Sequence, residues 1–370
     1  MLEAVYQSKK ISKEQLSGQM LGVSNLILGM SVAMPRLLLS WLSECAEQER
    51  VAPFNLYYMH GSEHLRNTLL KPCLSGRISP RPLFLSASDR QALAESKDEA
   101  WMQFVPTNFH QVGRLLTDHI SPDCFMVTVS SMDKHGYFSL GTNADYGASV
   151  IRKARRVVVE VNSNMPKTFG ECTIHISEID ALVEHDEALC ETQLSEPGPI
   201  DKIIASQIAE HIHDEDTLQM GVGGVPNAVL GMLDSHRNLG LHSELFSPAM
   251  VRLIQWGVLT GKKKSWMQHK HVFTLALGDK AMYDFMDDNP SIVGYPASWV
   301  NNPAVISKNN NMVSVNAAIE VDLTGQVNAE HMNGQQFSGT GGQLDFVRGL
   351  IWPRMAVLLS RFILQQKKVR

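Results

Sequence analysis

Residues 217–233, Thr-Leu-Gln-Met-Gly-Val-Gly-Gly-Val-Pro-Asn-Ala-Val-Leu-Gly-Met-Leu, predict a short buried strand, a glycine turn and a helix in succession. Similar apolar runs occur at 125–129, 157–161 and 271–277, and helix-like segments such as 200–211 alternate with them. Strands that alternate with helices in this way favour an α/β architecture with mainly parallel sheets. We therefore predict that fold class.

The chain has 370 residues, of which 44% are apolar and 19% charged, which is typical of a globular protein of about two domains. The clearest boundary is the segment 191–199, Glu-Thr-Gln-Leu-Ser-Glu-Pro-Gly-Pro, which has no apolar run. It predicts a first domain over 1–190 and a second over 200–349. The formal net charge of −5 argues against nucleic acid as the main partner.

The five cysteines stand at positions 45, 73, 124, 172 and 190, an odd number confined to the first half. This pattern fits reduced thiols in a cytoplasm better than a disulfide framework. The stretch 20–42 is mostly apolar, but glycines, polar residues and Pro35 interrupt it. We expect a buried strand over 26–34, then a helix with Pro35 in its first turn, and a soluble cytoplasmic protein without a membrane partner.

Two glycine loops are candidates for ligand binding: Gly221-Val-Gly-Gly224 and Gly339-Thr-Gly-Gly342. Glycines let backbone N–H groups approach a ligand, but both loops lack the sixth-position glycine of a dinucleotide fingerprint, and each could be a simple tight turn. Between them, Glu244 has apolar neighbours that could raise its pKa and its reactivity. A solvated glutamate at a turn explains that segment equally simply. The histidine-rich pieces lack metal-ligand spacing, so we predict no metal site.

Ordered motifs over about 127–349 resemble the acetyl-CoA hydrolase/transferase family, most closely its 4-hydroxybutyrate CoA-transferase-like branch. They include residues 127–141, 218–229, 240–247, 288–290, 301–303, 314–327 and 338–349. Among them are Gly240-Leu-His-Ser-Glu-Leu-Phe-Ser247 and Ser338-Gly-Thr-Gly-Gly-Gln-Leu-Asp-Phe-Val-Arg-Gly349.

The resemblance implies two similar CoA-transferase-type α/β domains with the active site at their junction, and ping-pong transfer of CoA between carboxylic acids. Glu244 would be the nucleophile that forms an anhydride and then a glutamyl-CoA thioester. The Val222 amide and an amide at Gly341 or Gly342 would bind the oxyanion, and Asn301 would orient the thioester carbonyl. The remaining loop glycines would leave room for CoA: Gly221, Gly223, Gly224 and Gly339.

By the same resemblance, CoA is a substrate and no cofactor is bound permanently. The substrates would be a short acyl-CoA, such as acetyl-CoA, and a small carboxylic acid such as 4-hydroxybutyrate or acetate. The family also implies a homodimer or homotetramer. Two alternatives stay open: an acetyl-CoA hydrolase, in which water replaces the acceptor acid, and a truncated, inactive family member.

Two departures from the family pattern stand out. Pro248 follows Phe246-Ser247 where the branch usually has aspartate, which puts substrate choice in doubt. The tail 350–370 is basic, and no acidic residue follows Asp345. It could be a basic amphipathic helix, but we favour a frameshift that leaves the second domain incomplete, because another reading frame near 361–369 can encode a family-like continuation.

Overall fold

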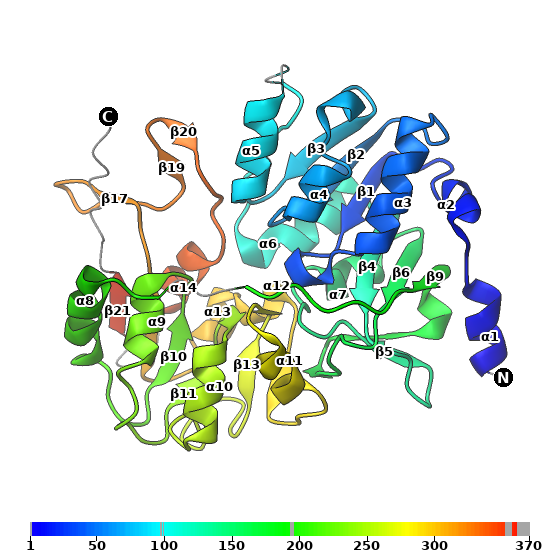
Figure 1. Cartoon of the computed structure of the whole chain (residues 1–370). Helices are drawn as coiled ribbons and strands as arrows, with labels where there is room; N and C mark the ends of the chain where they lie inside the picture. Colours follow the sequence, from blue (N-terminus) through cyan, green and yellow to red (C-terminus); the bar gives the residue numbers. More distant parts are fainter. Residues whose placement is uncertain (1, 97, 99, 193–195, 352–356, 361–370) are drawn as a thin grey trace.

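The computed structural model describes residues 2–96, 98, 100–192, 196–351 and 357–360. It is a mixed α/β structure with mostly parallel sheets, which confirms the predicted fold class (Figure 1). The largest sheet has six parallel strands in the order β3-β2-β1-β4-β6-β9. These strands are β1 (Asn25–Leu28), β2 (Phe54–Tyr58), β3 (Ile78–Pro82), β4 (Cys124–Val129), β6 (Val157–Val161) and β9 (Ala181–Glu184).

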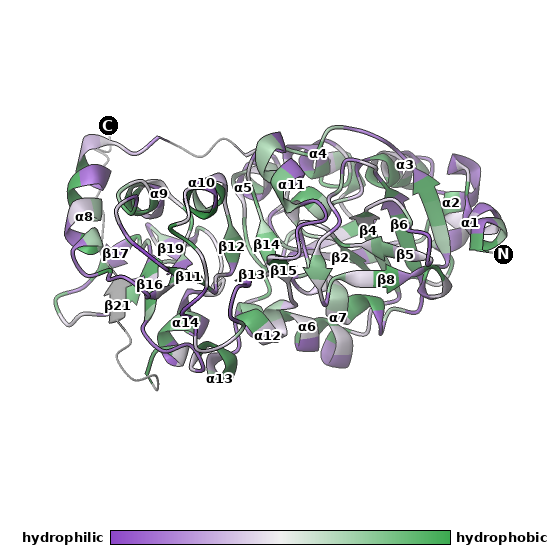
Figure 2. Cartoon of the chain, turned by 90° about the horizontal axis from the view of Figure 1, so that it is seen from below, coloured by the Kyte–Doolittle hydropathy of each residue, from purple (hydrophilic) through white to green (hydrophobic). Residues whose placement is uncertain are grey.

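Helices cover both faces of this sheet, and strand β4 shows why. Phe125, Val127 and Val129 pack into one core cluster, whereas Cys124 and Met126 pack into another, because successive side chains of a strand point to opposite faces. Apolar residues therefore concentrate on the central strands (Figure 2). The first cluster includes residues of α1 (Leu2–Lys9), α6 (Phe109–Arg114) and α7 (Gly147–Ile151), and the second includes residues of α2 (Lys13–Gln19), α3 (Arg36–Glu47), α4 (Glu63–Asn67) and α5 (Ala87–Glu95).

A second parallel sheet has the order β11-β10-β16-β21, with β10 (Thr217–Met220), β11 (Gly240–Leu241), β16 (Met312–Asn316) and β21 (Val357–Ser360). One core cluster joins it to α8 (Pro199–Ala209), α9 (Gly224–Leu230), α10 (Pro248–Gln255) and α11 (Lys280–Met286). Another joins Met312 to α13 (Pro303–Ile306) and α14 (Gln343–Gly349).

Smaller strand pairs complete the fold. They are β5 (Tyr137–Ser139) with β8 (Thr173–His175), β12 (Leu245–Phe246) with β14 (Leu275–Ala276), β17 (Glu320–Val321) with β18 (Val327–Asn328), and β19 (His331–Met332) with β20 (Gln335–Gln336). The strand β15 (Ile292–Gly294) lies between β13 (His271–Phe273) and β7 (Phe169–Gly170). Since β7 precedes the predicted boundary at 191–199 and β15 follows it, the two halves share a sheet.

Three local expectations differ from the structure. The apolar run at 271–277 is divided into β13 and β14, which belong to different sheets. The strand predicted over 26–34 ends at Leu28, and a 3-10 turn, Ser31–Ala33, follows it. Pro35 is the residue before helix α3 rather than a member of its first turn. Within the predicted tail 350–370, residues 357–360 form β21, while 352–356 and 361–370 lie outside the described residues.

No helix within the described ranges has both the length and the apolar character needed to span a membrane. All five cysteines are unpaired, and each of them lies within the described part of the chain.

Candidate active site

Glu244 lies between strands β11 and β12, at the junction of the two halves of the chain. Its backbone carbonyl accepts hydrogen bonds from the N–H groups of Thr274 and Leu275, which fix the strand segment in place. Its carboxylate Oε2 accepts a hydrogen bond of 2.6 Å from Asn301 Nδ2. Asn301 is fully buried and directly follows helix α12 (Ala297–Val300). The structure thus brings together two of the residues that the sequence predicted.

The environment of Glu244 shifts its ionisation. Burial, opposed by the hydrogen bond from Asn301 and aided by the negative charge of Asp345, raises the pKa of its carboxyl to about 7. A carboxyl group with a pKa near 7 is a stronger nucleophile when ionised than one with the ordinary value, because basicity and nucleophilicity rise together.

The second glycine loop lies directly against the Glu244–Asn301 pair. A Cβ atom on Gly342 would lie 1.7 Å from Glu244 Oε2 and 2.1 Å from Asn301 Nδ2, so no larger residue fits there without moving that pair. Gly341 has a φ of 54°, in the left-handed region that favours glycine. A Cβ on Gly339 would lie 2.9 Å from the Leu83 carbonyl oxygen. This loop needs glycine for close approach, not only for a turn.

The first glycine loop connects β10 to α9, and together with Glu244 and the second glycine loop it lines one cavity. Val222 is exposed, and Gly223 has a φ of 129°, which a side chain would strain. The cavity has a volume of about 490 Å³, and its lining includes Gly221, Val222, Glu244, Gly339, Gly341 and Gly342. Gly223 and Gly224 are not part of that lining. Gly224 instead packs against the Asp201 carboxylate of α8.

Family comparisons agree with this geometry. Residues 4–191 match the acetyl-CoA hydrolase/transferase N-terminal domain, and residues 278–355 match the C-terminal domain of the same name. The 4-hydroxybutyrate coenzyme A transferase of Clostridium kluyveri is 35% identical over 348 residues, which cover 94% of this chain and 79% of that protein. The chain belongs to the acetyl-CoA hydrolase/transferase family. The match predicted from the motifs is therefore confirmed, and it begins well before residue 127.

Other members of the acetyl-CoA hydrolase/transferase family are similar over different lengths. The succinyl-CoA:cyclohexane-1-carboxylate CoA transferase of Geobacter metallireducens is 44% identical over 69% of this chain, and the aligned part spans only 58% of that relative. The crystal structure of RipA from Yersinia pestis superposes with a TM-score of 0.92 at 39% identity, covering 97% of this chain and 83% of RipA. The 4-hydroxybutyrate CoA-transferase of Porphyromonas gingivalis gives a TM-score of 0.76 at 31% identity, covering 97% and 82%.

The first half of this family member contributes residues that sequence reasoning missed. His60, Phe84, Leu85 and Arg90 line the cavity. The His60 and Phe84 rings stack with their centroids 4.3 Å apart. No motif in the sequence indicated these residues, because they reach Glu244 only when the two halves pack together.

His110 and Asp345 are a second missed pair, and they join the two halves beside the glycine loop. His110 Nδ1 lies 2.6 Å from Asp345 Oδ1, and the His110 backbone N–H donates to Asp345 Oδ2 at 2.9 Å. The Phe109 N–H donates to the Gly341 carbonyl at 3.0 Å. Helix α6 of the first half therefore holds both the second glycine loop and the first turn of α14.

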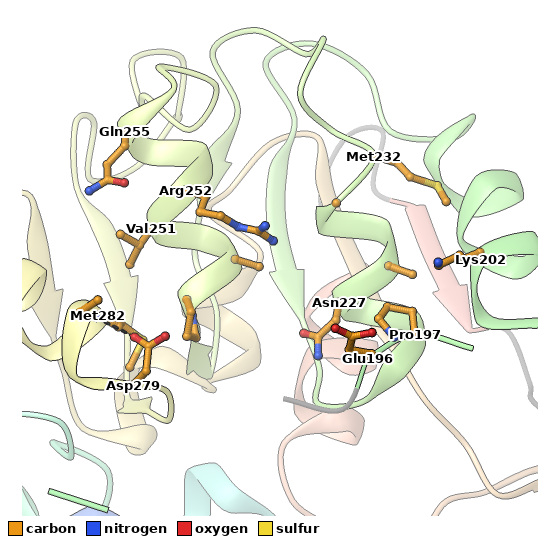
Figure 3. A pocket seen from close by; sticks show the side chains of 15 residues that line it. Glu196, Pro197, Lys202, Asn227, Met232, Val251, Arg252, Gln255, Asp279 and Met282 are labelled. Atoms are coloured by element: carbon orange, nitrogen blue, oxygen red, sulfur yellow. Dashed lines mark hydrogen bonds between the residues drawn. The ribbon is translucent and has the colours of Figure 1, made fainter. Parts of the chain in front are cut away.

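A larger groove of about 620 Å³ lies between helices α8, α9, α10 and α11, with Lys202 and Arg252 on its walls (Figure 3). None of the predicted catalytic or CoA-binding residues lines this groove, although Pro248 does. Size therefore does not identify the active site here, whereas the carboxylate, the amide and the glycine loops do.

One group of side chains in the described residues has metal-ligand atoms within 4.8 Å of one another: Glu160, His185 and Glu187. Arg36 Nε lies 3.3 Å from Glu187 Oε1, and the Leu38 N–H donates to Glu160 Oε2 at 3.0 Å. The two carboxylates thus already have a cation and a helix N–H as partners. We interpret the group as an ion-pair network within the first half.

Proposed function

We propose that this chain transfers CoA between a short acyl-CoA, such as acetyl-CoA, and a small carboxylic acid, such as 4-hydroxybutyrate or acetate. The observation that carries the proposal is the position of the Glu244 carboxylate. It accepts a hydrogen bond of 2.6 Å from Asn301, and it shares a cavity with two glycine loops at the junction of the two halves. A carboxylate can form both an anhydride and a thioester, which divides a difficult exchange into easier steps.

In the first half-reaction, ionised Glu244 attacks the acyl-CoA carbonyl, and the C–S bond breaks to release CoA thiolate and leave an acyl-glutamyl anhydride. The thiolate then attacks the glutamyl carbonyl, which forms glutamyl-CoA thioester and releases the donor acid as its carboxylate. An acceptor carboxylate reverses these two steps and leaves with CoA. Charge and atoms balance without an added cofactor, so CoA enters as a substrate.

Each tetrahedral intermediate carries an oxyanion, which needs hydrogen-bond donors. We assign this role to the N–H of Val222 and to that of Gly341 or Gly342, and we assign orientation of the thioester carbonyl to Asn301. Gly221 and Gly339 leave room for the reacting groups. Gly223 and Gly224 act by shaping the turn into α9 rather than by lining the cavity.

The substrate class rests on the walls of the cavity. Phe84, Leu245, Leu275 and Leu277 give an apolar lining around the carboxylate, which supports a short acyl group. Pro248, the departure from the family pattern, is the first residue of α10, a position where its missing N–H costs no helical hydrogen bond. The proposal also includes a homodimer or homotetramer, two domains over 1–190 and 200–349, and a cytoplasmic location.

A direct test is exchange of isotopically labelled acetate into acetyl-CoA by the purified protein, with free thiol measured in parallel. A transferase should incorporate label into acetyl-CoA, and the amount incorporated should increase with the concentration of the labelled acid. Release of free CoA without an acceptor would instead assign a hydrolase. If neither reaction occurs in a folded protein, the chain is an inactive family member.

The pH dependence of exchange should report the Glu244 carboxyl. Because burial raises its pKa to about 7, the nucleophilic carboxylate is depleted below that pH and fully formed above it. We expect kcat/KM for acyl-CoA to rise about tenfold per pH unit on the acidic side and to level off above pH ~7. A profile that is flat from about pH 5 to 8 would contradict a nucleophile in this environment.

A further inference from the structure

His242 stands two residues before Glu244 and has no place in the chemistry described so far. It is fully buried and is not part of the cavity lining. Its Nε2 lies 2.8 Å from the carbonyl oxygen of Val300, the residue immediately before Asn301. Because a carbonyl oxygen only accepts, the imidazole must donate its Nε2 proton here.

The Val300 carbonyl needs this donor. It belongs to the last residue of α12, and the last carbonyls of a helix have no partner inside the helix. The following residues do not supply one, because Pro303 has no N–H and the Ala304 N–H donates to Asn302 Oδ1 at 2.9 Å. His242 therefore fixes the end of the helix from which Asn301 projects.

The contacts form a closed ring. Only Ser243 separates His242 from Glu244 along the chain. One peptide bond connects Val300 to Asn301, and two hydrogen bonds, of 2.8 Å and 2.6 Å, close the ring. We propose that His242 is a positioning residue that holds the Asn301 amide on the Glu244 carboxylate through the Val300 carbonyl. The effect on catalysis rests on the function proposed above.

The surroundings of His242 keep this donor in place. Burial and, to a smaller extent, the charge of Lys264 lower the pKa of His242 to about 3, against the opposing effect of the Val300 hydrogen bond. Lys264 Nζ is itself held by the carbonyls of Leu241 and Lys270, at 2.8 and 2.9 Å. The Trp299 and Phe346 rings pack beside the imidazole. His242 thus stays neutral over the pH range in which Glu244 ionises.

The test compares His242→Leu, which removes the donor, with His242→Gln, whose Nε2 can replace it. The charged groups around Glu244 stay in place, namely Asp345 with its partner His110. We expect H242L to lower kcat by ~10–100-fold with little change in KM, because one aligned hydrogen bond at the reacting group is lost. The acidic limb of the pH profile should move to higher pH, because the Asn301 hydrogen bond lowers the pKa of Glu244. H242Q should restore most of kcat and most of the wild-type position of the acidic limb.

Coupling to Asn301 separates positioning from a general loss of stability. In an Asn301→Ala background, H242L should lower kcat by less than a further ~2-fold, because the effects of two residues that act through one contact are not additive. His271→Leu is the matched control: His271 is also buried near Lys264, but it lies outside the ring. H271L should lower the melting temperature and leave the pH profile unchanged. If H242L behaves like H271L, or adds its full effect to N301A, the proposal is wrong.

A readout without turnover keeps the two proposals distinct. In protein labelled with ¹³C at Glu Cδ, the Glu244 resonance is identified by its absence in Glu244→Gln, and its titration gives the pKa directly. An upward shift in H242L, even in a protein without exchange activity, would support positioning while the proposed function fails. Normal exchange with an unshifted Glu244 pKa in H242L would refute positioning alone.

Discussion

Replacing Glu244 by Gln is expected to reduce CoA exchange by ~10⁴-fold or more, because an amide forms neither the anhydride nor the thioester. The substitution keeps the volume of the side chain and can keep a hydrogen bond with Asn301, so the cavity should remain intact. Labelled-acetate exchange measures the loss. Borohydride reduction followed by peptide mass analysis should trap a glutamyl-CoA thioester at Glu244 in the wild-type protein and not in E244Q. Exchange that survives in E244Q would exclude the covalent mechanism.

The same variant should be more stable than the wild type at alkaline pH. The pKa of Glu244 rises from 4.5 in the unfolded chain to about 7 in the folded one, so the folded protein holds this proton more tightly. Wild-type stability attributable to this group therefore falls as the pH rises from about 4.5 to 7 and stays low above that window. We expect E244Q to gain about 1–3 kcal/mol in the free energy of unfolding at pH ~8 and nothing at pH ~4. Denaturant titrations at the two pH values check this, and an equal gain at both would contradict it.

Replacing Gly342 by Ala should have the second largest effect, a loss of exchange of ~10²-fold or more. The added Cβ would lie 1.7 Å from Glu244 Oε2 and 2.1 Å from Asn301 Nδ2, so the pair or the loop must move. A displacement of about 1 Å in a reacting group is enough for a loss of this size. Gly342 has a φ of −105°, which alanine adopts easily, so the fold itself should tolerate the change.

Gly18→Ala is the control for G342A. Gly18 lies in helix α2, and a Cβ there would have no atom within 4 Å. Activity should be unchanged, and the free energy of unfolding should increase by about 0.5–1 kcal/mol, since alanine favours a helix over glycine. Wild-type exchange in G342A, measured together with an unchanged melting temperature, would mean that this loop does not lie against Glu244 in the working enzyme.

Patterns local in the sequence predicted much of the fold. The runs at 125–129 and 157–161 are central strands of the first sheet, because a strand buried on both faces favours a mostly apolar segment. The predicted strand at 217–220 is β10 of the second sheet, although two of its buried residues, Thr217 and Gln219, are polar. The strand predicted over 26–34 was too long, because hydrophobicity continues after Leu28 while the backbone turns at Ser31, whose φ is 51°. Burial alone does not distinguish a strand from a buried turn.

The residues of the candidate site also fall into two groups: those that the sequence predicted and those that only the structure showed. Glu244, Val222, Asn301 and the glycine loops were found because short motifs around them resemble a family. His60, Phe84, His110 and Asp345 were not found. His60 and Phe84 share a cavity with Glu244, which belongs to the other half of the chain, and the partner of His110 is Asp345, 235 residues later. His242 was quoted within a motif, but its role depends on the Val300 carbonyl, 58 residues later.

The sequence by itself determined the fold class and the family, and it led to the proposal that Glu244 is the nucleophile, because apolar periodicity and short motifs act through neighbours along the chain. Only the tertiary structure decided the pKa of Glu244, the fit of Gly342 and the ring through His242. Desolvation, close approach and hydrogen-bond geometry depend on atoms that distant segments bring together. The reactivity of Glu244 is therefore a property of the packed junction between the two halves, not of the segment that contains it.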